Sequence, residues 1–371
     1  MMSDSLEEVI SPERVAAFSA GLPAPLEDRR VVFALYGRNA LFSGLRAIAA
    51  RTNKRTVLVP DMNCGVEVET AVAAGFNVVF YPVDPIALQV SSKCIGAHCN
   101  GNTAAVVLTH YFGFPQQSVV DVAELCREVG VALIEDCAHG LGSDFNGRPL
   151  GTIGDMSIFS LRKAIPVPHG GALFVRDPEM EVPAMRQPPP EAVDFDSLIY
   201  FSQRHGLFRA GVSIDAIYRH LGREIDHFGP RLAQYGGYEL GLSRLAQALI
   251  QVIDVSQLLR RRQAAFRSYA HYFSHSSTRM MRPLYGVCPD SVFPPFYPIV
   301  SALDSECTYQ KLQDTGCRAP IPFWSINQRF TNLQCSKVLL DLRRRLMILP
   351  LAEPLTESEL DHVIQVLEGD L

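Results

Sequence analysis

A single lysine lies between two apolar runs in the stretch IFSLRKAIPVPHGGALFV, which covers residues 158–175. Lys163 is one of five lysines in the chain, in which arginine supplies most of the positive charge. Burial disfavours the ammonium form of a lysine, and the free amine can then attack an aldehyde to form a Schiff base. Arginine cannot do this, because a guanidinium stays protonated. Lys163 is therefore the candidate nucleophile, although a lone lysine is more often a solvated surface charge.

Other polar residues stand where apolar runs end. Asp136 closes the run VALIED, His110 follows VVLT, and Ser160 precedes Lys163 by three residues. An unpaired carboxylate at a buried strand end is costly, so Asp136 needs a cationic partner or several hydrogen-bond donors, which a structural ion pair also provides. His139 follows three residues after it. Because ligands of open parallel sheets gather beyond the carboxyl ends of the strands, we expect these side chains to share one site.

A predicted helix start supplies a different kind of group. Gly37, Arg38 and Asn39 open the helix pattern of residues 37–52. The first N–H groups of a helix have no partner within it, and they suit a phosphate. An ordinary glycine-led helix start explains the same residues equally well.

Alternating strands and helices must position these groups. Short apolar runs predict strands, and amphipathic stretches of about a dozen residues predict helices between them. The predicted strands are 55–60, 77–83, 103–110, 131–137, 155–161 and 170–175, and the predicted helices are 37–52, 66–76 and 118–130. This rhythm indicates an α/β fold with a mainly parallel mixed sheet covered by helices on both faces.

The second half of the chain has a different pattern. Residues 182–194 are rich in proline, residues 196–225 look helical, and a long helix is predicted over 243–273. A closing helix follows Thr356, which is a plausible N-cap. At 371 residues the chain is too long for one simple core. We therefore expect a large domain over 1–242, with a helical insertion near 190–235, and a linking helix with a smaller α+β domain over 243–371.

Bulk composition excludes several classes of protein. The net charge of −5 gives no reason to expect nucleic acid as a partner. The polar start MMSDSLEEVI is not a signal peptide, and the chain contains no apolar run of membrane-spanning length. Nine cysteines, an odd number, favour reduced thiols and a cytoplasmic protein. Cys94 and Cys99 lack a second matching pair, so we expect no metal site.

The segment ALIEDCAHGLGSDFNGRPLGTIGDMSIFSLRKAIPVPHGGALFV resembles the DegT/DnrJ/EryC1/StrS family of pyridoxal-phosphate aminotransferases, of fold type I. Its specific motifs are E-D-x-A-H, then G-D-x-x-x-F-S, then K-x6-G-G. The stretches PDMNCGVEVETAVAAGFNVVFYPVD and LRRRLMILPLAEPLTESELDHVIQVL are similar to other parts of the family pattern. The resemblance implies a homodimer with shared active sites. It also implies transfer of an amino group from glutamate to a keto-sugar, which in most members of the family is linked to a nucleotide.

The resemblance assigns roles around the cofactor, pyridoxal 5'-phosphate. Lys163 would bind it as a Schiff base and shuttle a proton between substrate and cofactor. Asp136 would pair with the pyridinium nitrogen and keep it protonated. Ala138 would pack on one ring face, and His139 would lie beside the ring.

The resemblance also implies a phosphate site, and here the sequence departs from the family. Ser160 and the backbone amides of Gly37 and Arg38 would bind the phosphate. Asn63 and Cys64 stand where the family usually has a ring-stacking aromatic residue.

The spacing from the phosphate serine to the lysine differs too, being S-x2-K rather than S-x4-K. Ser157 is an alternative phosphate ligand for this reason. The segment that usually reads N-x-R and reaches the partner subunit reads GGYELGLSR, with Tyr238 and Arg244 as candidates.

Three other functions are compatible with parts of the sequence to different degrees. A family member that binds the cofactor without turnover, as a regulator or scaffold, fits the altered loop and the missing aromatic residue. A serine acyltransferase would use Ser160 and Lys163 as S-x-x-K, but no K-T-G element exists. A nicotinamide dehydrogenase would need G-x-G-x-x-G after a strand, and that motif is missing. Relatives that dehydrate sugars carry histidine in place of the lysine, so Lys163 favours amino transfer.

Overall fold

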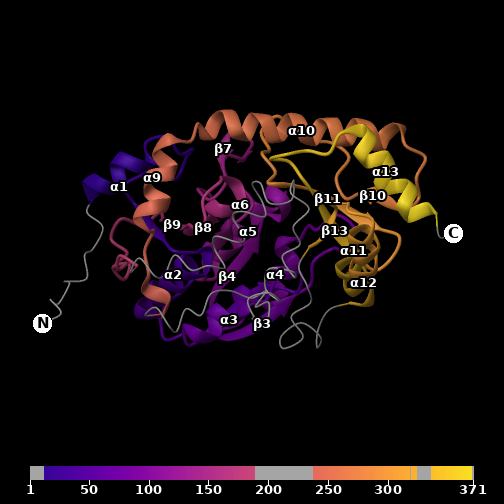
Figure 1. The fold of residues 1–371 in the computed structure, drawn as a ribbon. Coiled ribbons are helices and arrows are strands. Elements are labelled where there is room, and N and C mark those ends of the chain that lie inside the picture. Colours follow the sequence, from indigo (N-terminus) through magenta and orange to yellow (C-terminus); the bar gives the residue numbers. More distant parts are fainter. Residues whose placement is uncertain (1–11, 189–236, 318, 324–335, 370–371) are drawn as a thin grey trace, which may run out of the picture.

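The computed structural model describes residues 12–188, 237–317, 319–323 and 336–369. These residues build a seven-stranded and a four-stranded β-sheet side by side, besides a two-stranded hairpin, and one long helix runs along both larger sheets (Figure 1). Within this described part, no helix combines the length and apolarity that crossing a membrane requires.

The larger sheet has seven strands in the order β1-β9-β8-β5-β4-β2-β3. Strands β8, β5, β4, β2 and β3 are parallel to one another, whereas β9 runs antiparallel to both β8 and β1. The sheet is thus mixed and mainly parallel, which confirms the predicted fold class. Its strands are β1 (Val31–Ala34), β2 (Thr56–Pro60), β3 (Asn77–Tyr81), β4 (Thr103–Thr109), β5 (Ala132–Asp136), β8 (Met156–Ser160) and β9 (Gly171–Val175).

Helices cover both faces of this sheet because successive side chains of a strand point to opposite sides. On one face, α2 (Gly37–Arg51) and α3 (Val66–Ala73) pack against a layer that includes Val57 and Val59. On the other face, α4 (Ser92–His98) and α5 (Val119–Glu128) pack against a layer that includes Leu58. Helices α1 (Pro12–Ser19) and α9 (Arg244–Val252) cover the β1 end of the sheet.

Short elements connect these strands and helices. The 3-10 turn η1 (Tyr111–Gly113) follows β4, and the hairpin of β6 (Asp144–Phe145) and β7 (Arg148–Pro149) follows β5. The four-residue helix α6 (Leu161–Ala164) follows β8 directly, and the 3-10 turn η5 (Gly237–Glu239) precedes α9.

The smaller sheet has four antiparallel strands in the order β10-β11-β13-β12. They are β10 (Met281–Pro283), β11 (Phe296–Ser301), β12 (Ile321–Pro322) and β13 (Leu346–Pro350). Helices α10 (Val255–His275), α11 (Ser305–Asp314), α12 (Lys337–Arg345) and α13 (Glu357–Glu368) accompany them. Thr356 caps α13 through a capping box with Glu359, as the sequence predicted for its N-cap.

The prediction of one continuous helix over 243–273 was wrong. Helix α9 ends at Val252, and the side chain of Asp254 accepts a hydrogen bond from the backbone N–H of Gln257 to start α10. An aspartate at this position satisfies a free N–H at a helix start, so it favours a new N-terminus over continuation. The predicted helical stretch 196–225 and the insertion near 190–235 lie outside the described residues.

Candidate active site

The carboxyl ends of three neighbouring parallel strands bring the predicted polar residues together. β4, β5 and β8 are adjacent and parallel, so His110, Asp136 and Ser160 stand at the same edge of the sheet. Ser160 is also the N-cap residue of α6, which carries Lys163 out from that edge. The helix ends at Ala164, since the prolines at 166 and 168 cannot continue it.

Lys163 contacts His139, and a backbone hydrogen bond orients the imidazole. The lysine Nζ lies 3.1 Å from His139 Nε2. The other ring nitrogen, Nδ1, accepts a hydrogen bond of 3.2 Å from the backbone N–H of Phe112. The ring therefore faces the Lys163 amine with Nε2, at a distance over which a proton can pass between the two groups.

Asp136 is a buried carboxylate with no cation in hydrogen-bond contact among the described residues. Its Oδ1 accepts a hydrogen bond of 2.9 Å from the N–H of Ala138, a partly buried residue just past β5. Burial, and then the charge of Glu67, raises the pKa of Asp136 to about 7, while the charge of Lys163 at longer range opposes this shift. Asp136 is therefore poised to stabilise a positive charge brought close to it.

Cys64 and Glu67 form a buried pair that the sequence reading missed in part. The Cys64 thiol donates to Glu67 Oε2 at 3.1 Å, and only 7% of Glu67 is exposed. Burial, and then the Glu67 charge, raises the pKa of the thiol well above its ordinary value, although Lys163 opposes this. One sequence feature could have predicted this pair. Glu67 lies three residues after Cys64, between two valines at the start of α3. Together these contacts place an acid and a protonated thiol near Lys163 and Asp136.

Asn63 serves the turn before α3. Its Nδ2 donates to the carbonyl of Pro60 at 2.8 Å, and its Oδ1 accepts from the N–H of Gly65 at 2.8 Å. Both ends of the amide are thus engaged by backbone. The charge of Lys163 acts on the neighbouring Cys64.

Gly37 and Ser160 lie against each other where α2 begins. A Cβ placed on Gly37 would lie 3.8 Å from the Cβ of Ser160, so the helix start and the hydroxyl-bearing residue share one corner. Ser157 stands three residues earlier on the strand and contacts Gly151 instead, because a Cβ there would lie 2.6 Å from the Ser157 hydroxyl. Strand alternation therefore turns Ser157 away from α2, and Ser160 alone of the two faces the corner.

The segment after η5 lies along the same corner. The Tyr238 ring stacks on Phe42 of α2, with centroids 4.5 Å apart, and its carbonyl accepts a hydrogen bond from Asn39. Arg244 is exposed at the start of α9. Within one chain, then, Tyr238 is close to α2.

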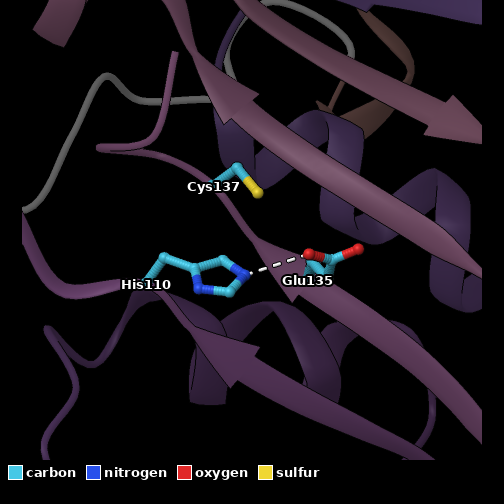
Figure 2. Close-up of side chains that lie close together, drawn as sticks. All are labelled: His110, Glu135 and Cys137. Carbon is cyan, nitrogen blue, oxygen red and sulfur yellow. Dashed lines mark hydrogen bonds and ion pairs between the residues drawn. The ribbon is translucent and has the colours of Figure 1, made fainter. Parts of the chain in front are cut away.

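A second buried cluster contains His110, Glu135 and Cys137, whose ligand-type atoms lie within 4.8 Å of one another (Figure 2). His110 Nδ1 accepts from the N–H of Gln116, so its Nε2 donates to Glu135 at 3.0 Å. Glu135 also accepts three backbone N–H groups, from residues 151, 153 and 154. Burial keeps the pKa of the Cys137 thiol well above its ordinary value. Because these lone pairs and protons are already engaged, the cluster is a structural hydrogen-bond network that braces β5 beside Asp136.

Comparison with known proteins decides the family. The model of the DegT/DnrJ/EryC1/StrS aminotransferase family matches residues 4–368, nearly the whole chain. The chain belongs to this family. The resemblance inferred from the motifs around Asp136 and Lys163 is thereby confirmed.

Individual relatives match over shorter stretches. A dTDP-4-dehydro-2,3,6-trideoxy-D-glucose 4-aminotransferase of Saccharopolyspora spinosa is 31% identical over 163 residues, which cover 43% of this chain and 42% of that protein. A GDP-perosamine synthase of Vibrio cholerae is 35% identical over 137 residues, covering 36% and 37% respectively. The matched region thus spans about two fifths of the length of these relatives.

Solved structures of the family share the fold. The aminotransferase TlmJ from Streptoalloteichus hindustanus has a TM-score of 0.66 and 23% identity, covering 98% of this chain and 91% of that one. The PLP form of the putative sugar aminotransferase Spr1654 from Streptococcus pneumoniae has a TM-score of 0.64 and 18% identity, covering 99% and 94%. These likenesses establish an aminotransferase-type fold for the whole chain.

Proposed function

We propose that this protein is a pyridoxal-phosphate-dependent aminotransferase that moves an amino group from glutamate to a keto-sugar. By analogy with most members of the family, we propose that this sugar is linked to a nucleotide. The observation that carries the proposal is the contact between the Lys163 amine and His139, with the buried carboxylate of Asp136 within electrostatic range. The sugar aminotransferases among the relatives support the substrate class.

The residues present fit the cofactor. Lys163 offers an amine for its aldehyde, held 3.1 Å from His139 Nε2, and Asp136 is a buried acid that lacks a cation in direct contact among the described residues. The N–H groups at the start of α2 and the adjacent Ser160 suit its phosphate. When bound, pyridoxal phosphate supplies an electron sink for the electrons released at the substrate carbon.

Each side chain has a defined task in this proposal. Lys163 would bind the cofactor and would then move the proton at the substrate carbon. His139 would hold the amine in position through Nε2. Asp136 would stabilise the protonated ring nitrogen, and Ala138 would lie against the ring.

We also propose the division into domains 1–242 and 243–371, and a cytoplasmic homodimer with shared sites. Family analogy supports the dimer. The two separate sheets support the division, although α9 at the start of the second domain packs on the first sheet.

The absorption spectrum tests the proposal. Purified protein with pyridoxal phosphate should show the visible band of a lysine-bound cofactor, and Lys163→Ala should abolish it. Glutamate should then convert the cofactor to its amino form, with loss of that band. A visible band that glutamate leaves unchanged would favour a protein that binds the cofactor without turnover, for which the Cys64–Glu67 pair in place of an aromatic ring is the supporting observation. Labelled glutamate with a panel of nucleotide-linked keto-sugars identifies the acceptor.

A further inference from the structure

The turn η1, which follows β4, holds two consecutive residues in the left-handed backbone region. Phe112 has φ 56° and ψ 20°, and Gly113 has φ 84°. Glycine adopts this region at no steric cost, but a bulky residue is an outlier there, because its Cβ crowds the following carbonyl oxygen. Such outliers persist only where the surrounding structure holds them, and they gather at functional sites. The backbone of Phe112 therefore needs both a cause and a role.

Buried contacts on both sides of Phe112 hold the turn. The hydroxyl of Tyr111 donates to the carbonyl of Met62 at 2.6 Å, and the N–H of Phe114 donates to the carbonyl of Tyr111 at 3.0 Å. Phe112 itself is fully buried. These contacts close the turn around Phe112, so its surroundings impose the left-handed conformation.

Phe112 and Gly113 contact His139 at three places. The N–H of Phe112 donates to Nδ1 at 3.2 Å, and the phenyl ring stacks on the imidazole with centroids 5.6 Å apart and planes 27° apart. A Cβ on Gly113 would lie 2.6 Å from the carbonyl oxygen of His139, so the two backbones touch there. Because φ sets the direction of the N–H relative to the side chain, the one left-handed angle of Phe112 aims both groups at His139.

Rings from the smaller sheet lie against the same imidazole. The centroid of Phe323, next to β12, lies 5.6 Å from that of His139, and the ring of Phe296 in β11 lies 5.9 Å away and nearly perpendicular. Phe323 also lies 5.0 Å from the ring of Phe112. Phenyl rings have no hydrogen-bonding group, so they do not determine which edge of the imidazole carries the nitrogens. The N–H of Phe112 supplies such a group.

The orientation of this imidazole decides what Lys163 meets. With Nδ1 on the N–H of Phe112, Nε2 lies 3.1 Å from the lysine Nζ. A half-turn of the ring about its Cβ–Cγ bond would put carbon atoms where both nitrogens now lie, and the contact with the amine would lose its proton-exchanging atom.

We propose that Phe112 is a positioning residue for Lys163: its left-handed backbone fixes the rotation of His139, which then presents Nε2 to the lysine amine. The inference rests on the proposed function for its role in amino transfer. It extends that function to a residue that acts only through His139.

Two substitutions of Phe112 separate the effect of its backbone from that of its ring. Phe112→Gly and Phe112→Val both remove the phenyl ring, but glycine adopts positive φ freely, whereas a β-branched residue strongly disfavours it. Phe112→Val should slow the capture of pyridoxal phosphate by Lys163 about 100-fold, the cost of a misplacement of about 1 Å. Phe112→Gly should keep most of the rate. Stopped-flow absorbance measures the rate, and Phe112→Ala replaces Phe112→Val if that variant does not fold. Equal rates in Phe112→Gly and Phe112→Val overturn the proposal.

Leu88→Val is the matched control. Leu88 is also fully buried and left-handed, with φ 51°, but it lies in the turn between Asp84 and Gln89. This variant should lose thermal stability as Phe112→Val does and should keep the wild-type rate. A comparable fall in rate in Leu88→Val would show that general destabilisation causes the effect, and it would overturn the proposal.

A double variant tests whether Phe112 acts through His139. Phe112→Val combined with His139→Phe should capture pyridoxal phosphate no more slowly than His139→Phe alone, because residues that act through one contact are not additive. Losses that multiply in the double variant would contradict the proposal.

Nitrogen-15 NMR of the imidazoles in cofactor-free protein gives a readout that needs no reaction. The two ring nitrogens of His139, assigned by their absence in His139→Gln, should keep their wild-type shifts in Phe112→Gly and should change in Phe112→Val. Unchanged shifts in Phe112→Val overturn the proposal. A protein that fails the spectral test with glutamate can still pass or fail this one, so the two failures are distinguishable.

Discussion

The Lys163 amine lies 3.1 Å from Nε2 of His139, and the backbone N–H of Phe112 donates to the other nitrogen, Nδ1, of that imidazole. Replacing His139 with phenylalanine removes the ring nitrogen that can exchange a proton with the amine. We expect the visible band to form about 100-fold more slowly after mixing with pyridoxal phosphate, at the lower end of the range for acid–base assistance. Stopped-flow absorbance measures this rate. His139→Gln keeps an N–H donor, so the rate should fall less in this variant. Equal rates in both variants and wild type would remove His139 from the mechanism.

Glu67 and Asp136 are coupled through charge. Burial is the first cause of the raised pKa of Asp136, about 7, and the Glu67 carboxylate is the second. Glu67→Gln removes that second cause, so Asp136 should lose its proton at a lower pH. Carbon-13 NMR of the aspartate carboxyl groups in cofactor-free protein measures the change. Cys64→Ser is the matched control, since it replaces the thiol and keeps the Glu67 charge. The coupling is refuted by a titration of Asp136 that is identical in Glu67→Gln and wild type.

The raised pKa of Asp136 has a stability cost in cofactor-free protein. Its folded value, about 7, lies above the ordinary value of 3.8, so between these limits the folded state binds a proton that the unfolded state has released. The contribution of Asp136 to the free energy of unfolding must then fall as pH rises through this window. Asp136→Asn should lack this dependence and should be more stable than wild type at pH 7, while binding the cofactor more weakly. Urea unfolding from pH 4 to 7 tests this, with the exposed Asp121→Asn as control. A stability difference between wild type and Asp136→Asn that stays constant with pH would contradict it.

The pKa of Glu135 is shifted in the opposite direction to that of Asp136, so its effect on stability has the opposite pH dependence. Burial alone raises its pKa, but the hydrogen bond from His110 and those from the backbone N–H groups outweigh burial and hold the pKa below its ordinary value of 4.5. The stability that this carboxylate contributes is present above about pH 4.5 and is lost as pH falls through the folded pKa. Glu135→Gln should cost about 3 kcal/mol at neutral pH, since it breaks a buried network, and the cost should shrink in acid. Urea unfolding at neutral and acid pH measures both values. The exposed Glu128→Gln should change neither.

Gly171 permits the close approach between β9 and the start of α2. A Cβ there would lie 2.2 Å from the Tyr36 carbonyl carbon, which real structures do not tolerate, so the backbone must move. Gly171→Ala should destabilise the fold by about 2 to 4 kcal/mol and weaken binding of phosphate-bearing ligands. Gly101→Ala is the control, because nothing lies within 4 Å of its added Cβ. Thermal melts measure stability, and ligand titrations measure binding. Equal stability and equal affinity in Gly171→Ala and Gly101→Ala would contradict this prediction.

Much of the fold was predictable because its signals are local. The strands ending at Asp136 and Ser160 are short apolar runs. Thr356 and Glu359 form a capping box, whose pattern spans only four residues of the sequence.

The break between α9 and α10 was missed because an apolar period continues across it, and the local cap at Asp254 is what starts the new helix. Val255 and Leu259 of α10 still pack on the core that α9 covers, and the later turns of α10 pack on a second core.

The sequence alone determined the family and led to Lys163 as the proposed amine, because the order and spacing of the motifs around Asp136 and Lys163 can be read without the fold. Tertiary structure decided which polar groups face one another. It placed His139 against Lys163, put Glu67 within range of Asp136, and turned Ser157 away from the corner that Ser160 shares with Gly37. These relationships join residues on different strands and helices, and they depend on register and burial, which the spacing of letters in a chain does not specify.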